Sequence, residues 1–120
     1  MRKTNSTNEI MQNLIVELLK KSQNDKMPIW KRLASDLSKP NRSRRIVNLS
    51  RINRHTKEDE TIVVPGKVLG DGVLDHKLTI AAYSFSGNAL EKMEKVKAKA
   101  ISIQDFMQED IKGKRVRILG

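Results

Sequence analysis

Two stretches of helical periodicity come first in this chain, and they constrain its fold more than any other feature. Apolar residues recur every three or four positions over residues 10–19 and 29–37, which places them on one face of an α-helix. Pro28 suits the first position of the second helix, and Pro40 ends it. We therefore expect residues 1–38 to form a helical hairpin.

The pattern changes to that of β-strands in the second half of the chain. Residues 61–64, 68–69 and 78–85 are β-branched, aromatic or alternately apolar, which predicts short strands. Pro65 is expected to mark the edge or end of a strand. The Asp71-Gly72 dipeptide is favoured in tight turns, so we expect it to join two strands.

Serine residues with N-cap spacing predict two further helices. Ser86 and Ser102 each precede a helical pattern, and short strands are expected at residues 100–101 and 116–119. The helix after Ser86 is expected to bury three apolar side chains: Leu90, Met93 and Val96. Helices and strands in this order predict an α/β fold with helices packed on a sheet.

At 120 residues the chain is expected to form a single domain over residues 1–120. Within it we distinguish the helical hairpin (1–38), a basic connection (39–57) and a mixed strand and helix core (58–120). Trp30 is expected in the core rather than on the surface as a base-stacking platform.

The basic connection has the most unusual composition in the chain. From Lys39 to Lys57 it holds seven Lys or Arg residues and no acid, within a chain of formal net charge +10. Interleaved Asn and Ser residues add hydrogen-bonding groups suited to phosphate and sugar oxygens. This combination favours a nucleic-acid contact surface over a merely solvated basic loop.

Two classes of nucleic acid fit this composition. The chain has only four aromatic residues, which argues against recognition by base stacking, and Tyr83 and Phe85 are expected to pack against a helix instead. Arg and Lys favour backbone and shape contacts with structured RNA, or a nonspecific grip on duplex DNA. The residues expected to make the contacts are Lys39, Arg42, Arg44, Arg45, Asn48, Arg51, Asn53, Arg54, His55, Lys57, Lys67 and Lys77.

Catalytic and cofactor-binding patterns are not found. The chain has no cysteine, and the glycines around Lys67 lack the spacing of a phosphate-binding loop. Asp75 and His76 are adjacent but have no serine in a nucleophile-elbow pattern, so we expect a solvent-exposed pair at a hairpin tip. We expect no enzymatic activity, no cofactor and no metal. The apolar run in the first helix is interrupted by Glu17, which predicts a soluble cytoplasmic protein.

Three segments carry a resemblance to a known family. Val47–Arg54, Val64–Gly72 and Leu74–Ser86 strongly resemble the archaeal and eukaryotic large-subunit ribosomal protein eighteen-e family, which is related to the C-terminal part of bacterial ribosomal protein fifteen. The resemblance implies an irregular superhelix of β-β-α turns and a structural role on the cytoplasmic ribosome. Its implied partners are large-subunit ribosomal RNA and neighbouring ribosomal proteins. The basic composition leaves one alternative function open, that of a DNA-binding architectural protein.

One departure from the family lies after the helix that follows Ser86. Members often place a Gly pair there, whereas this chain has Ala98 and Lys99. Because residues with side chains are uncomfortable in the left-handed conformation, we expect this helix to end without a left-handed cap.

Overall fold

The computed structural model describes residues 6–25, 27–38, 45–108 and 116–119. It divides into two compact units, Met1–Arg44 and Arg45–Gly120, and each is described by itself. The expectation of a single domain stays a prediction.

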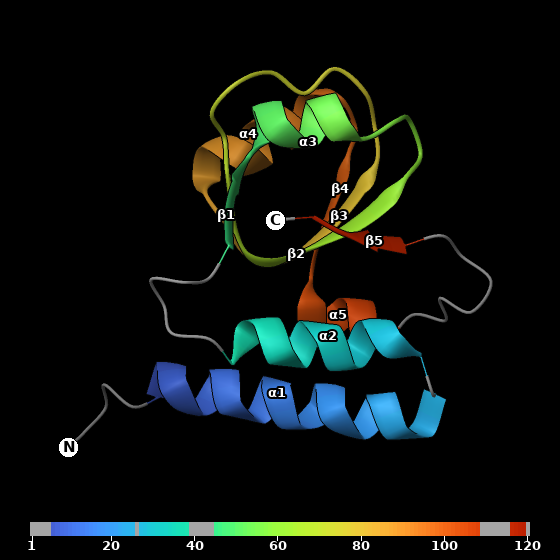
Figure 1. The fold of residues 1–120 in the computed structure, drawn as a ribbon. Helices are drawn as coiled ribbons and strands as arrows, with labels where there is room; N and C mark the ends of the chain where they lie inside the picture. Colours follow the sequence, from blue (N-terminus) through green and yellow to red (C-terminus); the bar gives the residue numbers. More distant parts are fainter. Residues whose placement is uncertain (1–5, 26, 39–44, 109–115, 120) are drawn as a thin grey trace. The chain divides into compact units, whose positions relative to one another are not determined.

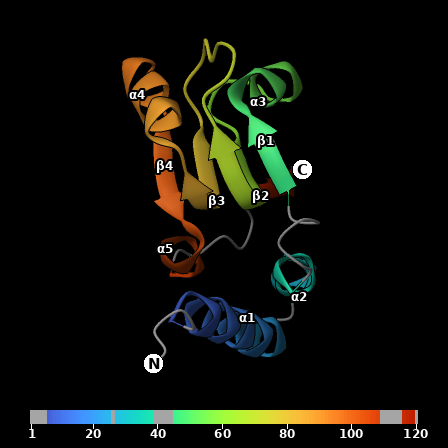
Figure 2. The same cartoon turned by 90° about the vertical axis from the view of Figure 1, so that its left-hand side faces the viewer.

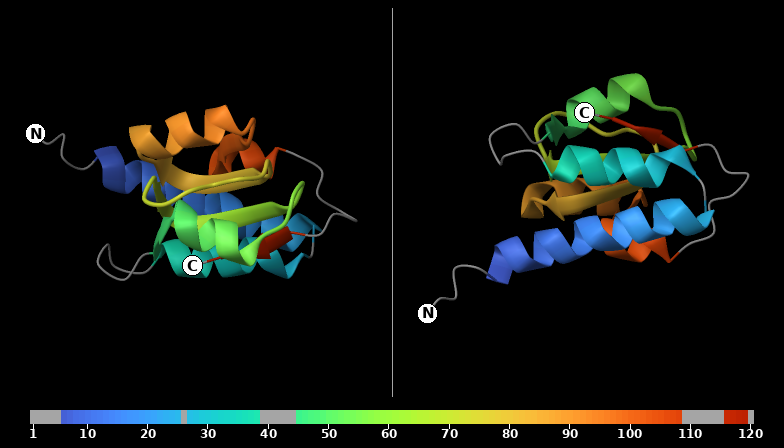
Figure 3. Two further views of the ribbon diagram at one scale, coloured as in Figure 1. Left: turned by 90° about the horizontal axis from the view of Figure 1, so that it is seen from above. Right: turned by 60° about the horizontal axis from the view of Figure 1, so that its bottom comes forward.

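The first unit is the predicted helical hairpin. Helix α1 (Ser6–Asp25) and helix α2 (Pro28–Leu37) run antiparallel and side by side (Figures 1 and 3). Pro28 stands at the start of α2 as expected, because its missing N–H would have no partner there. Trp30 is fully buried, and the Lys21 ammonium lies 5.2 Å from the centre of its ring.

The second unit is built on a five-stranded sheet in which every pairing is parallel. Figure 2 shows the order β1-β2-β3-β4. The strands are β1 (Arg45–Asn48), β2 (Thr61–Leu69), β3 (Thr79–Phe85), β4 (Lys99–Ser102) and β5 (Val116–Ile118). The α/β class and the N-terminal hairpin predicted from the sequence are thus confirmed.

Strand β2 has one edge shared between the first and last strands of this unit. Strand β1 pairs with its residues Gly66–Leu69, and β5 pairs with Thr61–Val63. Pro65 lies inside β2, so the strand end is wrong as its place, and on the divided edge of β2 it falls between the residues paired with β5 and those paired with β1. Its missing N–H is tolerated because the β2–β3 register shifts between Val64 and Lys67.

Two helices cover one face of the sheet. Helix α3 (Leu49–His55) and helix α4 (Gly87–Lys95) lie over this face, as the view from above shows (Figure 3, left). Their buried side chains join the same core as alternate residues of β2 and β3. That core comprises Val47, Leu49, Ile52, Ile62, Val64, Val68, Leu74, Leu78, Ile80, Ala82, Ala89 and Met93, with Phe85 packed against it.

The predicted N-caps are confirmed. Ser86 accepts a hydrogen bond from the Ala89 N–H, and Ser102 accepts one from the Asp105 N–H at the start of α5 (Ile103–Met107). Within α4, however, Leu90 is 45% exposed. Its predicted burial is wrong because α4 turns Ala89 and Met93, four residues apart, toward the sheet.

The loop between β2 and β3 must be extended over most of its length. Because Thr61 of β2 pairs in parallel with Thr79 of β3, residues 70–78 must return the chain along the length of β2. The distance to be covered is about 26 Å, whereas the ten Cα–Cα steps from Leu69 to Thr79 can span at most ~33–36 Å. The predicted tight turn between strands at Asp71-Gly72 is therefore wrong, since a two-residue hairpin joins only antiparallel strands.

Helix α4 ends with a left-handed residue despite the missing glycine. Lys97 has φ 61°, its N–H donates to the Glu94 carbonyl, and the Ala98 N–H donates to the Met93 carbonyl. These two bonds form a Schellman motif, in which a left-handed residue satisfies the last helical carbonyls. The expectation of an end without a left-handed cap is wrong, because two recovered hydrogen bonds outweigh the strain at Lys97.

Candidate nucleic-acid interface

The basic segment is not the simple connection that the sequence predicted. Its residues from Arg45 onward form β1 and α3, so the arginines of this part lie on regular structure. Three predicted contact residues, Lys39, Arg42 and Arg44, lie outside the described residues, and of Arg45 only the backbone is described.

Helix α3 has three sides with different roles. Leu49 and Ile52 are fully buried in the core. Arg51, Arg54 and His55 are exposed to solvent. Arg51 and Arg54 are three residues apart and therefore neighbours on the helix surface, so their positive charges act together.

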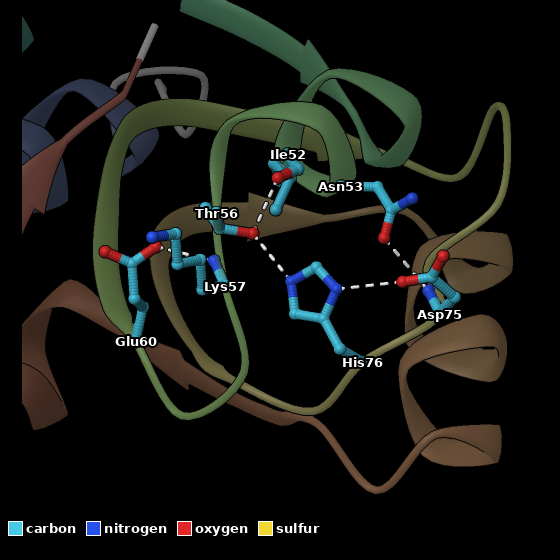
Figure 4. Close-up of polar contacts among 7 residues, drawn as sticks. All are labelled: Ile52, Asn53, Thr56, Lys57, Glu60, Asp75 and His76. Atoms are coloured by element: carbon cyan, nitrogen blue, oxygen red, sulfur yellow. Dashed lines mark hydrogen bonds and ion pairs between the residues drawn. The ribbon is translucent and has the colours of Figure 1, made fainter.

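The third side of α3 is bonded to the returning loop. Residues 50, 53 and 56 follow each other at a spacing of three, and each contacts residues 70–78. Figure 4 shows the contacts of Asn53 and Thr56. The Ser50 N–H donates to the Asp71 carbonyl at 3.0 Å, and the Asp75 N–H donates to the Asn53 side-chain oxygen at 3.0 Å. Core packing and loop bonds together fix the direction in which the arginines of α3 point.

His76 completes the attachment of the loop. Its Nε2 lies 2.8 Å from the Thr56 hydroxyl, and its Nδ1 lies 2.9 Å from the Asp75 carboxylate. The Thr56 hydroxyl also lies 2.7 Å from the Ile52 carbonyl, so this hydroxyl links the end of α3 to the returning loop. The prediction of a solvent-exposed pair is wrong for His76, whose side chain is only 14% exposed, and correct for Asp75, whose side chain is 69% exposed.

The same network perturbs one carboxyl group. The hydrogen bond from His76, followed by the contact with Asn53, lowers the pKa of Asp75 below its ordinary value. Asp75 therefore remains ionised and continues to accept from His76 into more acidic solutions than an isolated carboxyl would.

Beside this network lies a surface that we call the α3 basic face: Arg51, Arg54, His55 and Lys57. Within the described part of the chain, these side chains form no hydrogen bond or ion pair. Two of the three acids that follow are already engaged, because Asp59 lies 3.9 Å from the Lys77 ammonium and Glu60 lies 3.2 Å from the Arg117 guanidinium. The positive charge of the α3 basic face is thus uncompensated.

Other predicted contact residues lie elsewhere or have other partners. Lys67 shares a ladder position with Ile46, and both point to the face of the sheet opposite α3, because neighbouring Val47 and Val68 belong to the core. Asn48 is half-buried at the N-cap of α3. Lys77 is exposed beside Asp59.

Sequence reasoning missed Arg117. Strand β5 brings it beside the end of α3, where its Nη2 group donates to the His55 carbonyl and to Glu60. A concave pocket of about 450 Å³ opens there, lined by Arg54, His55, Thr56, Lys57, Glu60 and Arg117. No local signal marks Arg117, because only the pairing of β5 with β2 places it next to α3.

Two other kinds of feature are absent from the residues that the structure describes. No group of three or more His, Cys, Asp or Glu side chains that could hold a metal ion occurs in the described ranges. Nor does any helix in those ranges have the length and apolarity needed to cross a membrane.

Comparison with known proteins agrees with the resemblance seen in the sequence. A ribosomal protein family model, whose description names the 50S proteins L15 and L18e and a 60S counterpart, matches residues 44–101. The chain is 46% identical over 117 residues to the large ribosomal subunit protein eL18 of Sulfurisphaera tokodaii, covering 98% of this chain and 96% of that protein. It is 42% identical over 119 residues to eL18 of Methanothermobacter thermautotrophicus, covering 99% and 98%.

Proposed function

Because the chain belongs to the ribosomal protein family that includes eL18, we propose that it is a structural, non-catalytic component of the large ribosomal subunit that binds ribosomal RNA through the α3 basic face. The named relatives are large ribosomal subunit proteins, and they match nearly the whole chain.

The observation that carries the RNA-binding part of the proposal is the uncompensated charge on a fixed helix. Arg51, Arg54 and Lys57 have no carboxylate partner in the described ranges, although Asp59 and Glu60 follow them closely. Unpaired cations on a helix whose backbone is already fixed neutralise phosphates at little cost in backbone ordering. In this role the protein reduces the repulsion between RNA strands and holds them in place.

The footprint extends beyond this helix. Lys39, Arg42, Arg44 and Arg45 precede it directly and carry the same charge, and Lys77 lies beside the turn that follows. We do not place Lys67 on the same surface, because it points to the opposite face of the sheet.

The test measures binding of the full chain to a large-subunit ribosomal RNA fragment as salt is raised. Each neutralised phosphate contributes about 0.7–0.9 to the slope of log K against log salt, so Arg51→Gln with Arg54→Gln should flatten the slope by about 1.4–1.8. The matched control is Lys95→Gln with Lys97→Asn, which removes two exposed charges at the end of α4. Asn tolerates the left-handed conformation at position 97.

Equal flattening by both double variants would mean that binding is diffuse, and would contradict the assignment to α3. A duplex DNA of the same length serves as competitor. If it displaces the ribosomal RNA fragment at equal concentration, the alternative of a DNA-binding architectural protein replaces the proposal.

A further inference from the structure

The pocket beside the end of α3 shares Arg54, His55 and Lys57 with the α3 basic face, and Arg117 and Glu60 make this part of the surface concave. Its lining carries three cations, Arg54, Lys57 and Arg117, against one carboxylate, Glu60. Its volume of about 450 Å³ falls within the several hundred Å³ typical of small-molecule sites and exceeds what a phosphate group alone would fill. The pocket therefore has both the charge and the size for an anion with a sizeable organic part.

Arg117 is held in one orientation in this pocket. Its Nη2 group donates to the His55 carbonyl and, at 3.2 Å, to Glu60 Oε1. The same Glu60 oxygen accepts the Lys57 N–H at 2.7 Å, so the carboxylate is itself fixed. The Nε and Nη1 hydrogens of Arg117 have no partner in the described ranges. An arginine fixed in this way can donate one hydrogen bond to a phosphate from Nη1 or Nε, and its charge adds to that bond.

The rest of the lining suits a nucleoside. His55 and Arg54 supply a planar imidazole and a planar guanidinium, which are the groups on which unstacked RNA bases rest. Thr56 cannot compete for the phosphate, because its hydroxyl is bonded to the Ile52 carbonyl and to His76. These bonds also hold Thr56, one residue of the lining, in place.

We propose that this pocket binds a phosphate ester carrying a nucleoside, namely one RNA nucleotide that has left its helix. Arg117 donates one hydrogen bond to the phosphate from a nitrogen other than Nη2, Lys57 adds charge, and the base lies against His55 or Arg54. The proposal rests on the proposed function for the source of the nucleotide, since a free nucleotide has the same chemistry.

Two variants test the pocket in the full chain with the large-subunit RNA fragment. Arg117→Lys keeps the charge but loses the bonds to the His55 carbonyl and Glu60 that hold the guanidinium in place, so affinity should fall about tenfold while the salt slope stays unchanged. Glu60→Gln keeps an acceptor for Arg117 and for the Lys57 N–H but removes the negative charge. Affinity should then rise about threefold to fivefold, a gain that a misfolded variant could not produce.

A second measurement uses adenosine 5′-monophosphate and inorganic phosphate as probes. In amide NMR spectra of the ¹⁵N-labelled chain, adenosine 5′-monophosphate should shift the signals of residues 54–57, 60 and 117. Inorganic phosphate should shift them less, and adenosine alone should leave them unchanged. Equal shifts by the nucleotide and by inorganic phosphate would overturn the part of the proposal that concerns the nucleoside.

The outcomes separate this inference from the proposed function. If the wild-type chain prefers ribosomal RNA but neither Arg117→Lys nor Glu60→Gln changes its affinity, the pocket inference is wrong and the proposed function stands. If the chain shows no preference for ribosomal RNA while adenosine 5′-monophosphate still shifts the pocket signals, the proposed function is wrong and the pocket is a site for free nucleotides.

Discussion

Replacing Gly72 by Ala should destabilise the second unit strongly, for two reasons that can be separated. Gly72 has φ +91°, a conformation that residues with a Cβ rarely adopt. A Cβ atom at this position would also lie 2.3 Å from the Ser50 Cβ, where the returning loop crosses the first turn of α3.

The expected cost follows from these two contributions. Left-handed strain costs about 1–2 kcal/mol, and forcing an extra methyl into a packed contact costs about 1–3 kcal/mol. The reduced entropy of the unfolded chain returns about 0.4–1 kcal/mol. We expect the free energy of unfolding to fall by about 3 kcal/mol in Gly72→Ala.

A second substitution removes the closest of the steric contacts. Ser50→Gly removes the Cβ that the new methyl would meet at 2.3 Å, and by itself should cost about 0.5 kcal/mol in helix propensity. The Ser50 Cα at 2.9 Å and N at 3.0 Å would remain, so in the double variant it should recover about 1 kcal/mol of the cost of Gly72→Ala and leave the backbone strain and these two contacts. Gly87→Ala is the matched control, since a Cβ there meets no atom within 4 Å, and its stability should stay within about 0.5 kcal/mol of wild type.

The assay is urea unfolding followed by far-UV circular dichroism, with the m-value as a check on two-state behaviour. Amide hydrogen exchange of β2 assigns the loss to the second unit. The reasoning is refuted if Gly72→Ala loses less than about 1 kcal/mol, or if the effects of the two substitutions simply add.

Three further outcomes follow from local geometry. Lys97→Gly should raise the free energy of unfolding by about 0.5–1 kcal/mol, because glycine relieves the left-handed strain at φ 61°. The greater entropy of the unfolded chain with glycine cancels only part of this gain. Unchanged urea unfolding would contradict this prediction. Ser86→Ala should cost about 1 kcal/mol by the same assay, because the Ala89 N–H loses its acceptor. The lowered pKa of Asp75 contributes stability above the ordinary carboxyl value of 3.8, and this contribution is lost as the pH falls through the folded-state pKa. Asp75→Asn should therefore show a smaller loss of thermal midpoint on acidification than wild type, and parallel acid profiles would argue against the His76 bond.

The features that could be predicted from the sequence are those decided by neighbouring residues. Pro28 sets φ for the first turn of α2, and Ser86 and Ser102 reach N–H groups only three residues away. Such interactions depend little on the rest of the chain. The helical hairpin and both later helices were accordingly predicted correctly.

The features that could not be predicted depend on distant pairing. Helix α3 has only seven residues and no side-chain cap bond, so its helical state depends on packing and on the loop rather than on local signals. The parallel pairing of β2 with β3 turned Asp71-Gly72 from an expected hairpin into a bend against Ser50. Of the candidate site, Arg51 and Arg54 were found by composition, whereas Arg117 was not, because it reaches the pocket only through β5.

The divided edge of β2 has a consequence for the order in which the molecule matures. While the chain is being synthesised, β1 to β4 emerge before β5, so residues Thr61–Val63 of β2 remain unpaired on that edge until β5 is made. An open backbone edge invites pairing with other chains. When β5 pairs with β2, it covers this open edge and places Arg117 in the pocket. Protection against aggregation and completion of the pocket therefore occur in one step.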